Sequence, residues 1–329
     1  MRLLTSRSGW KLPVVFLTNG GGVTERAKAT ELTELLRIPT EVHESQVILA
    51  HTPFRTLQKR TNSTRLVVGK GSTLDVARSY WQDGDGTLVT TSDVIRSAGP
   101  SMVPFSAHVD VLFPKKMPKK MPTMPTMPKT PPGSAGHRID EIYVFTDPAG
   151  DDWYNDLQVV LDTLLRNGAP VCGGGDGHQE TQQPKLFISQ RDLLFSNGFH
   201  SSRLGLGAWV RCLETLYKEI TGSELSYEVF GKPEPEVYRL AETSLREQRD
   251  RLGWGPEESL RVMAVGDNAG VDIRGANRAG WLSSLVLTGV ASPTDDGDDD
   301  GEDDALCWDE VPTYRHTNVL EVIQSHAFQ

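Results

Sequence analysis

The chain has 329 residues, enough for two domains or for one domain with a large insertion. Its net charge is −10, with 34 Lys and Arg against 44 Asp and Glu, which argues against a protein that wraps nucleic acid. Its three cysteines lie far apart, so they indicate neither a disulfide framework nor a Cys-x-x-Cys metal site, and they fit a reducing, intracellular compartment. No apolar stretch approaches the ~20 residues that a membrane-spanning helix needs.

The first strand is predicted at residues 13–17, an apolar run that leads into the glycine-rich turn TNGGG at residues 18–22. Glycines let backbone amides approach a ligand closely, and Thr18 adds a hydroxyl group. Thr24 is placed to cap a helix over residues 25–36. A tight connection without a ligand is the alternative interpretation. The Gly-x-Gly-x-x-Gly pattern of dinucleotide sites is absent from this turn.

Strands and helices then alternate along the chain. Strands are predicted at residues 46–50, 65–69, 109–113, 139–146, 185–189 and 227–230, and helices at 53–59, 73–81, 154–166, 206–220 and 236–251. This alternation predicts an α/β fold with parallel sheets. Lys70 follows the strand at 65–69, but the spacing of a P-loop fails because Gly71 comes after the lysine.

Two low-complexity segments interrupt this pattern. Residues 114–136 repeat Pro, Met, Lys and Thr, and prolines at this density exclude a helix or a sheet ladder. They predict a basic surface loop, with binding of an acidic partner as the alternative. Residues 295–304 are almost entirely acidic. They do not form an EF-hand loop, because Cys307 stands where the closing glutamate is needed, so a solvated acidic insertion is predicted.

A second group of polar residues follows predicted strand ends near the C-terminus. The strand at residues 262–265 ends at Gly266, followed by Asp267 and, five residues later, Asp272. Two acids at the end of a strand are costly without a positive partner, and carboxylate oxygens favour Mg²⁺. Solvated acids at an ordinary strand–turn–helix joint are the alternative. Another strand is predicted at residues 285–288.

Lys232 lies in the turn Gly231-Lys232-Pro233, where the following proline keeps it out of a helix. An exposed turn lysine is the alternative interpretation. If the predicted strands are parallel, their carboxyl ends share one sheet edge. A phosphate and its counter-cation could be bound there by the hydroxyl of Thr18, the ammonium of Lys232 and the carboxylates of Asp267 and Asp272.

The segments FLTNGGG, GKPEPEVYRLA and VGDNAGVDIRGAN, in this order, resemble motifs II, III and IV of the haloacid dehalogenase-like (HAD) superfamily. The insertion between motifs II and III resembles a C2-type cap, and its end, GLGAWVRCLETLYKEITG, is similar to subfamily IIA. Within that subfamily the chain is similar to the cat-eye-syndrome critical region protein five family. The resemblance implies a Rossmann-like core formed by residues 1–64 and 229–329, with an α/β cap formed by residues 65–228.

The resemblance also implies a Mg²⁺-dependent phosphatase that acts on a small phosphorylated metabolite, and it names neither the substrate nor the oligomeric state. The resemblance implies that Thr18, Asn19 and Gly20 bind the phosphoryl group and that Lys232 neutralises its charge. It implies that Asp267 binds Mg²⁺. Asp272 would either support the metal shell or position Lys232. Arg191 and Asp192 would lie on the cap face that meets the substrate.

Motif I of the superfamily is a strand that ends in Asp-x-Asp, whose first Asp attacks phosphorus and whose second protonates the leaving group. No acid lies before Glu25, and Asp83-Gly84-Asp85 follows a polar turn rather than an apolar strand. An incomplete N-terminus and an inactive chain are therefore expected. A non-catalytic binding protein and a scaffold are the alternatives. Members of this family are associated with mitochondria, but the basic, acid-free residues 1–11 are too short for a transit peptide.

Overall fold

The computed structural model describes residues 4–6, 9–58, 60–82, 84–106, 138–148, 153–169, 182–255, 260–291 and 307–326. The predicted strand at 109–113, the basic loop at 114–136 and the acidic insertion at 295–304 lie outside these residues. The chain divides into two compact units. Unit 1 comprises Met1–Pro53, Asp192–Gly205 and Phe230–Gln329, and unit 2 comprises Phe54–Arg191 and Leu206–Val229. The assignment of a hydrolase core and a cap to these residues stays a prediction.

Unit 2 contains a five-stranded sheet in which every neighbouring pair is parallel, so the predicted α/β class is confirmed. Its strands, in spatial order, are β11 (Glu228–Val229), β8 (Lys185–Ile188), β7 (Glu141–Val144), β5 (Thr64–Val68) and β6 (Thr87–Thr90). The predictions for β5, β7 and β8 are confirmed to within two residues at each end. The prediction missed β6 because its TLVT sequence is short and half polar.

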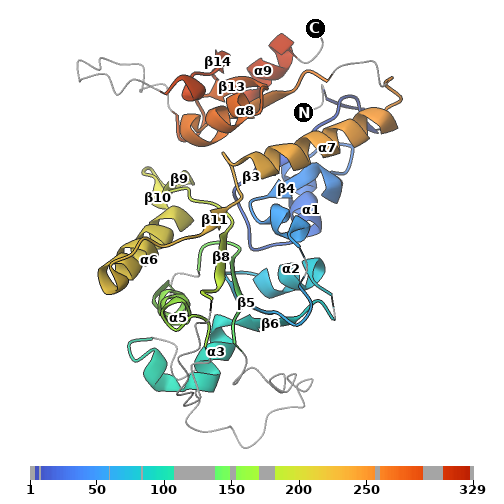
Figure 1. Ribbon diagram of the computed structural model, residues 1–329. Helices are drawn as coiled ribbons and strands as arrows, with labels where there is room; N and C mark the ends of the chain where they lie inside the picture. Colours follow the sequence, from blue (N-terminus) through green and yellow to red (C-terminus); the bar gives the residue numbers. More distant parts are fainter. Residues whose placement is uncertain are drawn as a thin grey trace, which may run out of the picture. The chain divides into compact units, whose positions relative to one another are not determined.

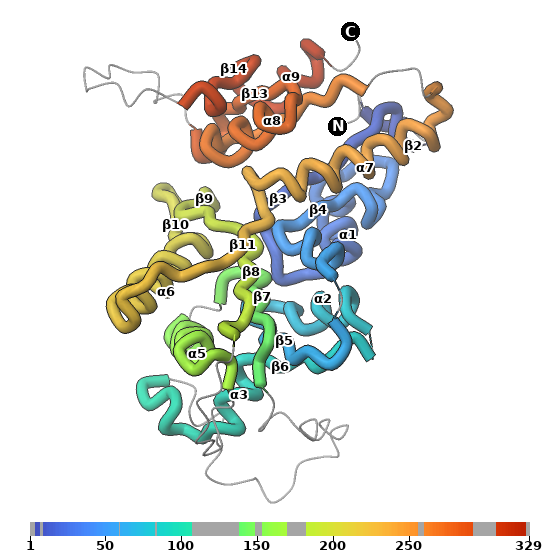
Figure 2. Tube along the Cα trace, viewed as in Figure 1, coloured from blue at the N-terminus to red at the C-terminus, as the bar shows by residue number. Residues whose placement is uncertain are grey.

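Helices cover both faces of this sheet (Figures 1 and 2). One face carries α3 (Thr91–Ala98), α5 (Trp153–Leu165) and α6 (Leu206–Thr221), packed on alternate aliphatic side chains of the central strands. The other face carries α2 (Thr73–Tyr80), where the Tyr80 ring stacks on Phe145 at a centroid distance of 6.2 Å. Short 3-10 turns are formed by Thr52–Thr56 (η2), in place of the helix predicted at residues 53–59, and by Pro100–Met102 (η3). Burial on both faces explains why these strands are apolar throughout.

In unit 1, β3 (Phe16–Thr18) pairs in parallel with β4 (Val47–Leu49). The helix α1 (Glu25–Leu36) packs on one face of this pair and α7 (Pro235–Arg251) on the other. The predicted cap of α1 is confirmed, since Oγ1 of Thr24 accepts a hydrogen bond from the Ala27 amide at 3.2 Å. A 3-10 turn, Glu44–Gln46 (η1), enters β4, and the short strands β1 (Thr5–Ser6) and β2 (Gly9–Trp10) form a hairpin.

Unit 1 also contains a three-stranded parallel sheet of β12 (Met263–Gly266), β13 (Leu282–Val286) and β14 (Tyr314–His316). A π-helical turn, Ala269–Ile273 (η5), leads from β12 into α8 (Arg274–Arg278), and Gly280 follows the end of this helix with φ of 74°. A 3-10 turn at Trp308–Glu310 (η7) and the helix α9 (Val319–His326) lie near the C-terminus, and β9 (Leu194–Phe195) and β10 (Arg203–Leu204) form an antiparallel pair.

The helix α7 contacts both parts of unit 1, β4 on one side and α8 on the other. Among the described strands, β3 pairs with β4 and β12 pairs with β13, so each of β3 and β12 has one edge without a partner strand. Val265 on β12 is correspondingly 39% exposed. No helix in the described part of the chain combines the length and the apolar character that crossing a membrane requires.

Candidate functional site

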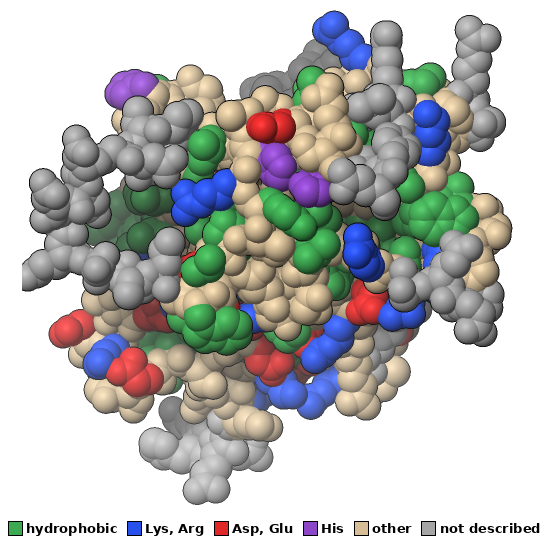
Figure 3. Space-filling model, turned by 90° about the horizontal axis from the view of Figure 1, so that it is seen from above, with side chains coloured by type: hydrophobic (Ala, Val, Ile, Leu, Met, Phe, Trp, Pro, Cys, Tyr) green, Lys and Arg blue, Asp and Glu red, His purple; other side chains and the backbone are tan. Residues whose placement is uncertain are grey.

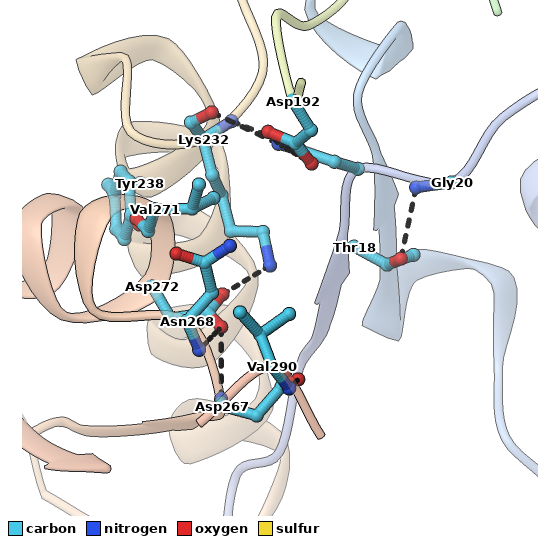
Figure 4. A network of polar contacts seen from close by, with 11 residues as sticks. Thr18, Gly20, Asp192, Lys232, Tyr238, Asp267, Asn268, Val271, Asp272 and Val290 are labelled. Atoms are coloured by element: carbon cyan, nitrogen blue, oxygen red, sulfur yellow. Dashed lines mark hydrogen bonds and ion pairs between the residues drawn. The ribbon is translucent and has the colours of Figure 1, made fainter. Parts of the chain in front are cut away.

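The turn after β3 carries the first predicted site residues. Oγ1 of Thr18 accepts a hydrogen bond from the Gly20 amide at 3.1 Å, so the hydroxyl hydrogen can be donated to an anion. The glycines place backbone amides rather than side chains beside this hydroxyl, and a Cβ on Gly20 would lie 3.4 Å from Oγ1. Figure 4 shows this contact between Thr18 and Gly20 in the same view as Lys232 and Asp272.

Asn19 connects this turn to two distant segments of unit 1. Its Oδ1 accepts the backbone N–H of Lys232 at 2.9 Å, and its Nδ2 donates to the Lys232 carbonyl at 3.0 Å. Nδ2 also donates to both carboxylate oxygens of Asp192, each at 3.0 Å. Because these contacts use the amide group of Asn19, the side chain fixes the Lys232 turn in place. Its expected role in phosphate binding stays a prediction.

Lys232 and Asp272 form a close ion pair, with 2.5 Å between Nζ and Oδ1. Both side chains are largely buried, at 13% and 12% exposed. The second oxygen of Asp272 accepts the amides of Asp267 and Asn268, each at 3.1 Å, at the point where β12 ends. A Cβ on Gly266 would lie 2.3 Å from the Asp272 side chain, so the glycine makes this approach possible. Figure 4 shows the lysine and the carboxylate pointing toward each other.

Asp267 occupies the carboxyl end of β12, and its Oδ2 accepts the Val290 amide at 2.7 Å. A Cβ on Gly289 would lie 1.9 Å from this oxygen. Gly289 and Val290 follow β13, so the loops after two neighbouring parallel strands fix this carboxylate. Sequence reasoning did not predict Gly289 or Val290, because the Thr288-Gly289-Val290 segment has no distinguishing pattern.

A cavity of about 480 Å³ opens beside Asp267. Its walls come from the ends of β12 and β13, from α9, and from residues 196 and 197. The lining residues are Ser196, Asn197, Val265, Gly266, Asp267, Val286, Thr288, Gly289 and Val319. The cavity thus combines one carboxylate with aliphatic and small polar side chains.

Tyr238 was not predicted as part of the site. It is buried on α7, its hydroxyl donates to the Val271 carbonyl at 3.4 Å, and burial raises its pKa, with the charges of Asp272 and Asp192 adding to the rise. A Cβ on Gly275 would lie 1.9 Å from the tyrosine hydroxyl oxygen. The absence of a side chain at Gly275 therefore lets α8 pack closely on Tyr238 of α7.

Of the two residues predicted for the cap face, Asp192 belongs to unit 1 and contacts Asn19, as described above. Arg191 belongs to unit 2. There its guanidinium lies 3.5 Å from Glu214 and 5.4 Å from the centre of the Tyr227 ring. Unit 1 thus brings together Asn19, Asp192, Lys232, Asp267 and Asp272, and Arg191 makes its contacts within unit 2.

Asp267 and Asp272 can be compared with the ligands that a magnesium ion requires. Among the described residues, no group of three or more His, Cys, Asp or Glu is placed to hold a metal. Mg²⁺ is commonly held by one or two carboxylates together with waters and substrate phosphate. Asp267 fits such a site, because the Val290 amide engages one of its oxygens and orients the other. Asp272 fits less well, because protein donors engage both of its oxygens.

Comparisons with known proteins show which family this chain is similar to. A family model described as HAD-hydrolase-like matches residues 229–311, which include Lys232, Asp267 and Asp272. A cardiolipin synthase (CMP-forming)/mitochondrial hydrolase fusion protein of Schizosaccharomyces pombe is 30% identical over 285 residues, covering 85% of this chain and 43% of that protein. A mitochondrial hydrolase of Saccharomyces cerevisiae is 29% identical over 303 residues, covering 87% of this chain and 80% of that protein.

Solved structures show the same fold. A glycerol phosphate phosphatase of Mycobacterium tuberculosis, in complex with magnesium, superposes with a TM-score of 0.54 at 19% identity, covering 94% of this chain and 67% of that chain. The present chain spans less than half the length of the fusion protein.

Proposed function

Because this chain belongs to the HAD-like hydrolase superfamily, we propose that unit 1 binds the phosphate group of a small phosphorylated metabolite. We further propose that the full-length protein is a Mg²⁺-dependent phosphatase. The observation that carries the proposal is the buried ion pair of Lys232 and Asp272, which holds an ammonium group at the carboxyl end of a parallel sheet beside Asp267. A fixed cation next to a carboxylate suits a phosphate and its counter-ion.

The proposed roles follow from the hydrogen bonds of each residue. Thr18 donates its hydroxyl hydrogen to a phosphate oxygen, and Lys232 neutralises phosphate charge. Asp272 positions Lys232 rather than binding metal, because protein donors already engage both of its oxygens. Asp267 holds Mg²⁺, which when bound would offset the charge of the phosphate. The magnesium complex of the similar Mycobacterium tuberculosis protein supports this choice of metal.

None of these residues is a candidate for the carboxylate that attacks phosphorus. No Asp-x-Asp follows an apolar strand in the sequence, and β3 and β12 each have one edge without a partner strand among the described residues. We propose that an additional strand, ending in Asp-x-Asp, pairs with both edges in the active protein. The 329-residue chain is then a phosphate-binding protein without hydrolytic activity.

Phosphate binding tests the first part of the proposal. Calorimetry on the 329-residue chain should detect inorganic phosphate binding, weakened about tenfold or more by Lys232→Met, because a charge-assisted contact is lost. Lys28→Met, which removes a lysine of α1 that pairs with Glu31, is the matched control and should leave binding unchanged. Equal phosphate affinity in wild type and Lys232→Met would contradict the proposed site.

Hydrolysis tests the second part. The chain as it stands should release no phosphate from p-nitrophenyl phosphate, and a chain extended at its N-terminus by an apolar strand ending in Asp-x-Asp should do so with Mg²⁺. Asp267→Asn in the extended chain should abolish that activity. Phosphate binding without any activity in the extended chain would favour the alternative function, a non-catalytic protein that binds a phosphorylated ligand.

A mitochondrial location is proposed because two relatives carry that word in their names. Fractionation of cells that express the full-length protein with a C-terminal tag tests it. The tag is expected in the mitochondrial fraction, and a tag confined to the cytosolic fraction would contradict the proposal.

A further inference from the structure

Between residues 192 and 205 the chain forms a hairpin that the proposed function does not use. Its strands β9 (Leu194–Phe195) and β10 (Arg203–Leu204) pair in antiparallel fashion, with Leu194 opposite Leu204 and Phe195 opposite Arg203. Partners in such a pair share one face of the ribbon, so both faces of this hairpin carry large apolar side chains. A loop that only connected two elements would be expected to expose polar residues instead.

The apolar side chains of this hairpin are exposed together. Their exposed fractions range from 40% to 61%. The residues are Leu193, Leu194, Phe195, Phe199 and Leu204. Single exposed apolar residues are ordinary, but a cluster of five within a short hairpin indicates a surface that contacts an apolar ligand or partner. Figure 3 shows how apolar and charged side chains intermix on the face that it presents.

The hairpin contacts the candidate site at its base and lines the cavity with the residues that follow β9. At its base, Asp192 accepts two hydrogen bonds from Asn19, the residue that also holds the Lys232 backbone. The Gly205 amide donates to the Leu193 carbonyl at 2.9 Å and closes this base. Beyond Phe195, residues Ser196 and Asn197 line the cavity that also contains Asp267. The hairpin therefore supplies part of the wall of the cavity beside Asp267, through two residues that directly follow its apolar strand β9.

The cavity is lined by both aliphatic and polar side chains. Val265, Val286 and Val319 give it aliphatic walls, and Val265 and Val319 are 39% and 44% exposed. Ligand sites are usually lined by apolar side chains with a few polar groups that orient the ligand. Here the polar groups are Asp267, Thr288, Ser196 and Asn197, and the last two come from the hairpin.

We propose that the substrate is a phosphate monoester that carries an apolar chain, with its phosphate at Thr18 and Lys232, next to the Mg²⁺ that Asp267 would hold, and its chain against the hairpin and the valine walls. This inference rests on the proposed function, because it requires the phosphate to bind at that site. Each methylene buried on the protein strengthens binding about fourfold, from ~0.8 kcal/mol per methylene. An ester with a long alkyl chain is therefore favoured over one with a short or polar leaving group.

Calorimetry on the 329-residue chain tests this, with ethyl phosphate and monomeric n-octyl phosphate as the probes. The octyl ester should bind ~10-fold or more tightly, since two or more methylenes become buried. A variant with Leu194→Ser and Phe195→Ser should lose this preference and keep its affinity for ethyl phosphate. Leu35→Ser, which removes a 71% exposed leucine of α1 in the same unit, is the matched control. Circular dichroism verifies that the variants are folded.

The outcomes separate the two proposals. Equal affinities for the two esters would overturn the apolar-chain inference and leave phosphate binding intact. If neither ester binds, or if Lys232→Met binds both as well as wild type does, the proposed function itself fails. A second arm uses phosphatidylcholine vesicles with and without phosphatidic acid. Binding that needs phosphatidic acid supports the inference, and equal binding to both vesicles overturns it in favour of a membrane-contacting surface.

Discussion

Nζ of Lys232 lies 2.5 Å from Oδ1 of Asp272, and the other oxygen of that carboxylate accepts two backbone amides at the end of β12. The lysine is therefore held in one position by a carboxylate that is itself fixed to the sheet. Asn19 holds the backbone of the same lysine through two further hydrogen bonds. Restraint of both the main chain and the side chain limits where the positive charge can lie, which is what recognition of one phosphate position requires.

Asp272→Ala should destabilise unit 1 by about 3–5 kcal/mol, because it leaves a largely buried ammonium and two amides without their acceptor. Urea denaturation of the variant measures the loss. Lys232→Met combined with Asp272→Ala should cost less than the sum of the two single changes, since the double variant contains no unpaired charge. Strictly additive losses would show that the two side chains do not interact.

Gly275→Ala should lower the free energy of unfolding by about 1–3 kcal/mol, because the new methyl group would overlap the buried Tyr238 ring. Thermal denaturation measures this change. Gly255→Ala serves as the control, since a Cβ there would meet open space, and a change within ±0.5 kcal/mol is expected. A Gly275→Ala variant as stable as wild type would contradict the close packing of α7 and α8.

Arg65 is fully buried in unit 2, where its Nε lies 2.9 Å from Glu141 and its guanidinium lies 5.1 Å from the centre of the Trp81 ring. Arg65→Leu should cost about 3–5 kcal/mol, because Glu141 would keep a buried charge without its close partner. Arg78→Leu is the control, since its ion pair with Asp75 is exposed and contributes little. Similar denaturation midpoints for the two variants would contradict this prediction.

His51 provides a pH dependence. Burial lowers its pKa to about 4 from the ordinary 6.5, so the folded protein holds this side chain neutral where the unfolded chain would protonate it. The unfolded state binds more protons between these values, so stability is full above pH 6.5 and falls as the pH decreases toward 4. A shift of this size corresponds to about 3 kcal/mol. The loss should be smaller in His51→Gln, measured by urea denaturation at pH 7 and pH 4.5. An identical pH dependence in the two proteins would contradict it.

The sequence predicted best where local physics decides the structure. The helix over residues 25–36 matches the prediction at both ends, because Thr24 caps it and its leucines and alanines repeat at helical spacing. The strands at 65–69 and 185–189 were predicted because burial on both faces leaves a continuous apolar run. The prediction was poorer for the last two strands. β13 begins at Leu282, three residues before the predicted start, and β14 was not predicted because its YRH sequence is mostly polar.

The candidate site was predicted in part. Thr18, Lys232, Asp267 and Asp272 were chosen because polar residues that directly follow apolar strands meet at one sheet edge. The sequence left two roles open for Asp272, and its hydrogen bonds favour the positioning of Lys232. Tyr238 could not be distinguished from the other inward residues of its helix, because helical spacing reports which face is buried and not what it contacts.

The sequence alone determined the α/β class, most strands and helices, and the residue types available for phosphate chemistry, because each of these depends on spacing between neighbours along the chain. The tertiary structure alone decided that Asn19 joins Asp192 to Lys232, that loops after two strands fix Asp267, and that an apolar hairpin adjoins the same cavity. These contacts connect residues more than twenty positions apart. Their existence depends on how the elements of unit 1 pack, which no local pattern encodes.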